Sequence, residues 1–539
     1  LIKLAASPER LAHGLILLPS RRAARALQAA FLDTANGQPM LLPRMLPIGD
    51  FGGDDDGGQF NSFVISSSLD GAANDLPPAI SKIRRQLCLA KLLRHFPLGG
   101  YFPSQSQSML LAESLGQLLD QLYNADATAN QLRDLLPDKF SRHWQDILAL
   151  LRILIDRWPE ILAHEGVMDA VDRRNRLLRH YAASWEKTQP SELIVVAGST
   201  GSIAATRDLI AVIERLPNGH VVLPGLDRNA GDQWQAICHD SSHPQYQLAR
   251  LLNHLDVVPE MVRDWVAESS VEPPELPARR DLMREVFRPA ILSSRWQRLG
   301  DSTTTIDRVA LRGLKVITVR DRREEATLIA LSLRESLEKP GQTAALVTPD
   351  RQLAELVIAD LNQWDITIED SAGKRLSLCG TGRFLLLLCD AVDSNFAPQQ
   401  LLSLLKHSYC AGGMEKDQFR QMVDRIEMAI LRGPSRGMSL DELAAALTDS
   451  NMRQFFKTHI TANLMPLIEC WHAPNPTLAS LVGGLGDTAE RLCANVMDSE
   501  GYGDRGIGAL IIWAGADGQI ANDLIRTLAT DGRDSNIDA

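Results

Sequence analysis

The stretch "LILLPSRRAARALQAAFL" (residues 15–32) joins an apolar run, a short turn and an alanine-rich segment that begins with arginines. The apolar run predicts a strand, and the segment after the turn predicts a helix that carries Arg21, Arg22 and Arg25 at its start. Cations are mildly unfavourable there, because the helix dipole makes the N-terminal end positive, unless an anion binds. The stretch therefore predicts either a phosphate cradle or an ordinary solvated helix start.

The same order of strand, turn and helix returns further along the chain. "ELIVVAGSTGS" (192–202) is a buried-type strand run, "IAATRDLIAVIERL" (203–216) is helical, and "HVVLPGLD" (220–227) is again strand-like. A second series begins at "LKVITVRDRREEATLIALSLRESL" (314–337) and continues with "TAALVTPDRQLAELVIADL" (343–361). Strands that alternate with helices at this spacing predict an α/β fold with two parallel-sheet domains.

Helical periodicity without strand signals fills the remaining long segments, so each sheet domain is expected to carry a large helical part. We expect a first sheet domain built from residues 1–77 and 189–300, with a helical insertion at 78–188. We expect the second sheet domain to begin at 301–382 and a helical domain to follow at 383–539.

The composition is that of a globular protein, with 45% hydrophobic and 23% charged residues among 539. A net charge of −11 argues against a surface coated in basic residues, although it does not exclude a local basic groove. The seven cysteines have no CxxC pair, which favours free thiols in a reducing cytoplasm. No apolar run approaches the ~18 residues that a membrane helix needs. The chain begins at leucine and ends in "TDGRDSNIDA", so we expect it to be a fragment of a longer protein.

The small-residue loop in "VAGSTGSIAAT" (196–206) is a candidate phosphate site, because backbone N–H groups between a strand and a helix bind anions. It matches neither GxGxxG nor the Walker A pattern, so a close-packed turn capped by Ser202 or Thr200 is favoured. No GxSxG, HExxH or spaced metal-ligand set occurs, and the histidines His239, His243, His254 and His472 are isolated, which favours packing or surface positions over ligands. The residues thus predict no catalytic residue, no cofactor-binding residue and no metal site.

Taken in order, several pieces resemble superfamily I helicases in a degenerate form. "LILLPSRRAARALQAAF" resembles the motif Ia of those helicases, and "LIVVAGSTGSIAATRDLI" stands where their Walker B segment lies. The ordered set, which includes "LPSRRAARAL", "LLPRMLPIGD", "AGSTGSIAAT", "HPQYQLARLL" and "LLSLLKHSYCAGG", resembles the AddB family of subunits from bacterial AddAB helicase–nucleases, in alphaproteobacterial form. This resemblance spans nearly the whole chain and implies two RecA-like (P-loop helicase-like) domains.

The resemblance also implies a function in recombinational double-strand break repair. The chain would be a non-motor, inactivated helicase subunit that binds single-stranded DNA through Arg21, Arg22 and Arg25. Active helicases place an Asp-Glu pair at the end of the Walker B strand, where this chain has Ala197 and Gly198. Without those acids neither magnesium nor the attacking water is held, so no ATP hydrolysis is expected from this chain.

The partners implied by the resemblance are an AddA-type helicase subunit, in a heterodimer, and single-stranded and duplex DNA ends. Full-length family members carry a nuclease domain with an iron–sulfur cluster and magnesium, both expected only beyond residue 539. The alternative function is an α/β enzyme that binds a nucleotide or a sugar phosphate at the 198–202 loop.

Overall fold

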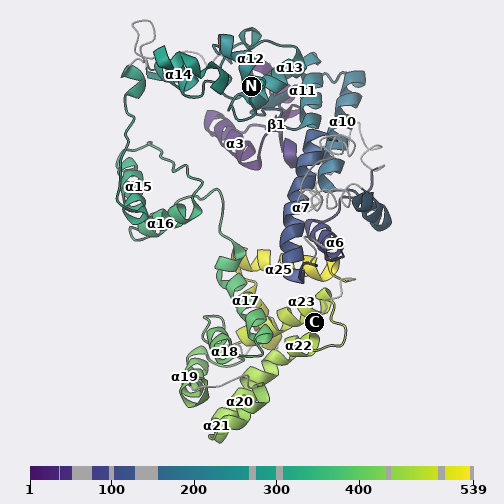
Figure 1. The fold of residues 1–539 in the computed structure, drawn as a ribbon, viewed down its shortest axis with the longest axis vertical. Coiled ribbons are helices and arrows are strands. Elements are labelled where there is room, and N and C mark those ends of the chain that lie inside the picture. The colour runs from purple at the N-terminus through teal and green to yellow at the C-terminus, as the bar shows by residue number, and fades with distance from the viewer. Residues whose placement is uncertain are drawn as a thin grey trace. The chain divides into compact units, whose positions relative to one another are not determined.

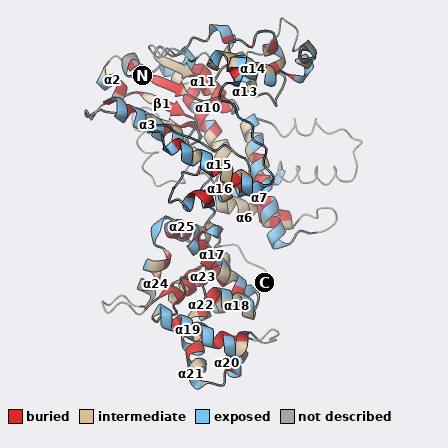
Figure 2. Cartoon of the chain, turned by 90° about the vertical axis from the view of Figure 1, so that its left-hand side faces the viewer, coloured by how far each residue is buried: buried red, intermediate tan, exposed pale blue. Residues whose placement is uncertain are grey.

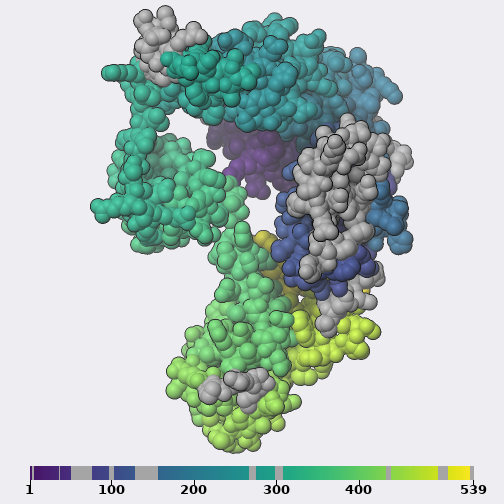
Figure 3. Space-filling model, in the orientation of Figure 1, coloured from purple at the N-terminus to yellow at the C-terminus, as the bar shows by residue number. Residues whose placement is uncertain are grey.

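A computed structural model of the chain describes residues 1–533 except for 6, 36, 51–75, 96–101, 128–155, 266–272, 274, 299–307, 433–438 and 496–503 (Figure 1). The described residues are mostly helical and include one sheet, which has four parallel strands. The chain divides into two compact units, residues 1–311 and 312–539. The first unit is coloured from purple to teal in Figure 3, and the second from green to yellow.

The first unit is built around the parallel sheet, whose spatial order is β2-β1-β3-β4. Its strands are β1 (Leu15–Leu18), β2 (Arg44–Pro47), β3 (Ile194–Ala197) and β4 (Gly219–Val222). Leu15 of β1 pairs with Arg44 of β2 on one side and with Ile194 of β3 on the other. The apolar run that opens the sequence analysis is therefore a central strand, as predicted.

Helices cover both faces of this sheet, which explains why its strands are apolar throughout. Ile16 and Val195 point to the face covered by α2 (Pro8–Ala12) and α3 (Arg21–Ala35). Leu17 and Ile194 point to the opposite face, where they pack with α10 (Ala170–Thr188), α11 (Ala204–Arg215) and α13 (Tyr246–Leu255). Figure 2 shows the buried strand residues in red between these layers. The α/β class is thus confirmed for this unit.

The other elements of the first unit are helical. They are α1 (Ile2–Ala5), α6 (Lys82–Arg94), α7 (Gln105–Ala125), a helix at 156–165, α12 (Trp234–Ile237), α14 (Glu275–Val286) and the 3-10 segments η1 (Ile48–Asp50), η2 (Gly231–Gln233), η3 (Pro259–Met261), η4 (Ala290–Arg298) and η5 (Arg308–Leu311).

The part of the chain that connects β2 to β3 has an apolar core of its own, formed by the helices α6, α7 and 156–165. Its apolar centre contains Leu89, Leu115 and the fully buried Trp158. A buried ion pair lies beside it, with Arg85 Nε 2.9 Å from the carboxylate of Asp169. Asp169 also caps α10 by accepting a hydrogen bond from the Val171 N–H.

The second unit begins with two helices in the predicted order, but the prediction of a strand before each helix is wrong. The helices are α15 (Arg322–Leu337) and α16 (Arg351–Asn362), capped by Asp321 and Asp350. Residues 314–319 and 343–349 form no strand. Val316 is 89% exposed and Val347 is 93% exposed. The backbone groups of a strand need hydrogen bonds from an adjacent strand, and the apolar side chains of a buried strand need helices packed on them. Neither segment has a paired strand among the described residues.

The rest of the second unit is helical and encloses a large apolar core. Phe384, Phe419 and Phe456 are buried at its centre. The elements are η6 (Leu376–Leu378), α17 (Gly380–Asp393), α18 (Pro398–Leu405), α19 (Lys416–Ile426), the π-helix η7 (Glu427–Leu431), α20 (Leu440–Ala446), α21 (Ser450–Phe455), the π-helix η8 (Phe456–Thr461), α22 (Ala462–Trp471), α23 (Leu478–Cys493), α24 (Asp504–Ile512) and α25 (Gly515–Asp531).

Candidate functional site

The central strands β1 and β3 define the switch point of the first unit. The chain runs from β1 to β2 on one side, and β3 lies on the other side of β1. In open α/β sheets, ligands bind outside the carboxyl ends of the strands at such a point. The loops that leave the two strands touch there, because a Cβ atom added to Gly198 would lie 3.4 Å from Pro19 Cδ. We call Pro19–Arg25 and the 198–202 loop the switch-point surface.

All three arginines singled out from the sequence lie on this surface, at the start of α3. Ser20 caps the helix, since its Oγ accepts a hydrogen bond from the Ala23 N–H at 3.2 Å. Arg21, Arg22 and Arg25 are exposed. Arg21 and Arg25 are one turn apart and share a helix face. Within the part of the chain that the structure describes, Arg25 forms no ion pair, so its charge is available to a ligand.

The 198–202 loop is a close-packed turn. A Cβ atom on Gly201 would lie 2.9 Å from Arg207 Cγ and 3.0 Å from Leu251 Cδ1, and Gly201 has a φ of +63°. Arg207 is buried and donates from Nη1 to the Gly201 carbonyl at 2.8 Å. The Gly201 N–H donates to Ser199 Oγ. The Gly201 N–H is thereby taken from a phosphate, and the close contacts favour packing as the reason for the small residues.

The expected cap of the helix after this loop is wrong. Ile203 occupies the N-cap position of α11, and this position makes no side-chain cap hydrogen bond. Ser202 and Thr200 therefore do not cap the helix. Burial compensates for the missing cap, because Leu209, Ile210 and Ile213 of α11 are almost fully enclosed.

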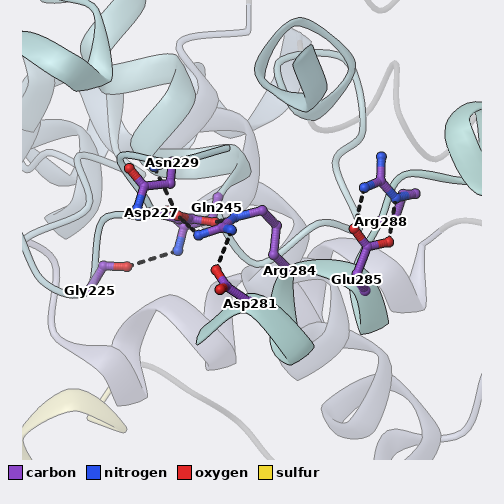
Figure 4. A network of polar contacts seen from close by, with 8 residues as sticks. All are labelled: Gly225, Asp227, Asn229, Gln245, Asp281, Arg284, Glu285 and Arg288. Atoms are coloured by element: carbon purple, nitrogen blue, oxygen red, sulfur yellow. Dashed lines mark hydrogen bonds and ion pairs between the residues drawn. The ribbon is translucent and has the colours of Figure 1, made fainter. Parts of the chain in front are cut away.

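A network of polar contacts fixes α14 on the loop that follows β4 (Figure 4). Arg284 binds Asp227 with two hydrogen bonds of 2.8 Å, and its Nη1 also donates to Asp281 at 2.7 Å. Gln245 joins the same loop by donating to the Gly225 carbonyl and accepting from the Asp227 N–H. A bidentate arginine–carboxylate pair of this kind holds two elements in one geometry.

Beside this network lies a pocket of about 360 Å³. Its walls are the turn 240–244 and the segment 286–296, which ends α14 and enters η4. Arg288, which is 6% exposed, lines the pocket and forms two hydrogen bonds with Glu285. The sequence analysis did not identify these residues. The sequence feature that could have pointed to the pocket is the segment 279–298, in which six arginines and two acidic residues are interleaved with Phe287 and Trp296.

The Asp227–Arg284 pair predicts a pH dependence. Burial alone would raise the pKa of Asp227, but the hydrogen bonds and charge of Arg284 outweigh it and leave the pKa below its ordinary value. A lowered pKa means that the pair stabilises the fold above about pH 3.9, the pKa of an unfolded aspartate, and that this stabilisation is lost as the pH falls further. We expect Asp227→Asn to flatten the fall of stability below about pH 4 in denaturation series.

The control is Asp264→Asn, which removes an acid whose side chain is 76% exposed and pairs with Arg228. Exposed pairs contribute little to stability, so its pH profile should follow the wild type. A wild-type profile for Asp227→Asn would contradict the role given to Arg284.

Comparisons with known proteins assign the chain to no family. No protein-family model matches the chain, and no curated protein shows significant similarity to it. Among the described residues, no group of three or more His, Cys, Asp or Glu side chains is placed to hold a metal ion. The seven cysteines are unpaired. None of the described helices is long and apolar enough to cross a bilayer.

Proposed function

We propose that this chain is a non-motor, helicase-like subunit of a bacterial DNA helicase–nuclease that acts in recombinational double-strand break repair. In this proposal it binds single-stranded DNA beside an active motor subunit of the AddA type. The observation that carries the proposal is the position of Arg21 and Arg25, which lie at the carboxyl edge of a parallel sheet, next to its β1/β3 switch point. The resemblance of the sequence to the AddB family supports the same function.

The arginines suit a phosphate backbone better than a specific small ligand. Arg21 and Arg25 are exposed and stand on one face of α3. Guanidinium groups one helical turn apart can contact adjacent phosphates without reading the bases. The chain as a whole carries a charge of −11, so a local basic surface is required for a nucleic acid to bind.

The proposal assigns ATP hydrolysis to the partner. Strand β3 ends at Ala197, and Gly198 follows with a φ of +80°. These positions provide no carboxylate for magnesium or for the attacking water. The alternative, a phosphate-binding enzyme, is weaker because the Gly201 N–H already donates to Ser199 Oγ within the protein.

The test is the double variant Arg21→Ala/Arg25→Ala, measured by binding of labelled single-stranded DNA across a salt series. Each phosphate that an arginine neutralises on a single strand contributes about 0.7 to the slope of log affinity against log salt. We expect weaker binding at low salt, and a slope smaller by about 0.7 for each phosphate that the variant no longer neutralises.

The matched control is Arg176→Ala/Arg215→Ala, which removes the same charge from exposed positions on α10 and α11. It should bind with the wild-type slope. If the Arg21/Arg25 variant folds normally and keeps both affinity and slope, the arginines are a solvated helix start and the proposal fails.

A further inference from the structure

The pocket between residues 240–244 and 286–296 has the features of a ligand site. Its volume of about 360 Å³ lies within the range of about 300–1,000 Å³ found for small-molecule pockets. One wall belongs to the turn before α13 and the other to the end of α14 and to η4. The Asp227–Arg284 contacts of Figure 4 hold α14 in place, so the pocket is formed before any ligand enters.

Arg288 provides a hydrogen-bond donor inside this pocket. Its side chain is only 2% exposed, and its Nε and Nη2 both donate to the carboxylate of Glu285. Its Nη1 makes no hydrogen bond to any residue that the structure describes. A guanidinium has five N–H donors, so this buried group retains donors for a ligand.

Two aromatic rings stand at the pocket and are unusually exposed. Phe287 and Trp296 are each 44% exposed. The indole N–H of Trp296 donates to the Glu285 carbonyl at 3.1 Å, which fixes the ring at its edge. The exposed ring face is then what Trp296 offers a ligand, and aromatic faces bind other flat rings by stacking.

The charges around the pocket favour a neutral ligand over a phosphate. Glu285 offsets the charge of Arg288, and Asp240 adds a further carboxylate. Burial lowers the pKa of His243, partly opposed by Asp240 and Asp227, so this imidazole is neutral at pH 7. Glu285 and Asp240 thus balance Arg288 and Arg295, so a phosphate would meet no net positive charge here, whereas a flat neutral ring with acceptor atoms needs none.

We propose that this pocket binds one unstacked base of single-stranded DNA, stacked on Trp296 and hydrogen-bonded through an acceptor atom to Arg288. The inference rests on the proposed function, which supplies the DNA strand. Arg295 stands next to Trp296 in η4 with its side chain 48% exposed, and it can contact a phosphate of the strand outside the pocket. Stacking on aromatic side chains with nearby cations is how single strands are held without sequence preference.

The test compares Trp296→Ala with the wild type, using a labelled oligothymidine strand and the same strand with abasic sites. Base–aromatic stacking predicts that the variant binds oligothymidine about 5- to 150-fold more weakly. Its affinity for the abasic strand should equal that of the wild type. Trp296→Phe keeps a ring and should restore most of the loss. Trp471→Ala, at an exposed tryptophan of α22, is the matched control.

A second measurement needs no variant. A fluorescent purine analogue placed in the strand should be quenched when it stacks on the wild-type protein, and Trp296→Phe should change the degree of quenching. Equal wild-type affinity for oligothymidine and the abasic strand would overturn the pocket while leaving the proposed function intact. Equal losses on both strands, or no loss in Trp296→Ala, would also overturn it. Failure of the wild type to bind either strand would overturn the proposed function itself.

Discussion

Asp169→Ala is expected to lower the free energy of unfolding of the first unit by about 3–5 kcal/mol, the cost of breaking a buried ion pair. The carboxylate is fully buried and lies 2.9 Å from Arg85 Nε. It accepts a hydrogen bond from the Trp158 indole and caps α10 at the Val171 N–H. Removing it leaves a largely buried guanidinium without one of its carboxylates and leaves a helix without its cap.

Burial raises the pKa of Asp169, although Arg85 acts in the opposite direction. Desolvation therefore outweighs the attraction of Arg85, and the pair serves mainly to fix the positions of α6 and α10. Chemical denaturation followed by circular dichroism measures the effect. Glu160→Ala is the control, because its pair with Arg157 is 63% exposed on both sides and should contribute less than about 1 kcal/mol. Equal stability of the two variants would refute this account.

Phe384→Ala is expected to destabilise the second unit by about 3–5 kcal/mol. The ring is fully buried in the largest core of that unit and packs against His407 and Tyr409, with ring centroids 5.1 Å and 6.1 Å away. The substitution removes the apolar area and leaves a cavity that the surrounding helices can fill only in part.

The control for this variant lies on the same helix. Leu386 of α17 is 45% exposed, so Leu386→Ala should change the unfolding free energy by less than about 1 kcal/mol. Both variants are compared by urea denaturation. A loss for Phe384→Ala no greater than that of the control would show that α17 is not anchored through this ring.

Local patterns predicted the first sheet well because its strands are buried on both faces. An apolar run followed by a turn and a helix identified β1 with α3, and β3 with α11, before any pairing was known. The same pattern failed at residues 314–319 and 343–349, where helices α15 and α16 formed but strands did not. A helix satisfies its own backbone, whereas a strand depends on residues elsewhere in the chain, which a local pattern does not contain.

The candidate site, too, could be predicted from the sequence only in part. The arginines of α3 could be identified from the local sequence, because three positive charges follow a predicted strand at the start of a predicted helix. The pocket could not be predicted from the sequence, because Asp240 and Arg288 belong to segments far apart in the chain that meet only in the folded structure. His243, isolated in the sequence, lines this pocket and accepts a hydrogen bond from the Gln245 N–H.

The pairing of β1 with β3 has a consequence for the order of folding. Leu15 pairs with Ile194, and the whole helical core around Trp158 lies between them in the chain. Closing a loop costs more entropy as the loop lengthens, by about 0.6 kcal/mol for each doubling. A helical segment that folds first shortens the effective loop and reduces this cost. During synthesis, β1 leaves the ribosome long before β3. The backbone groups on one edge of β1 therefore stay unpaired while the helices between the two strands form.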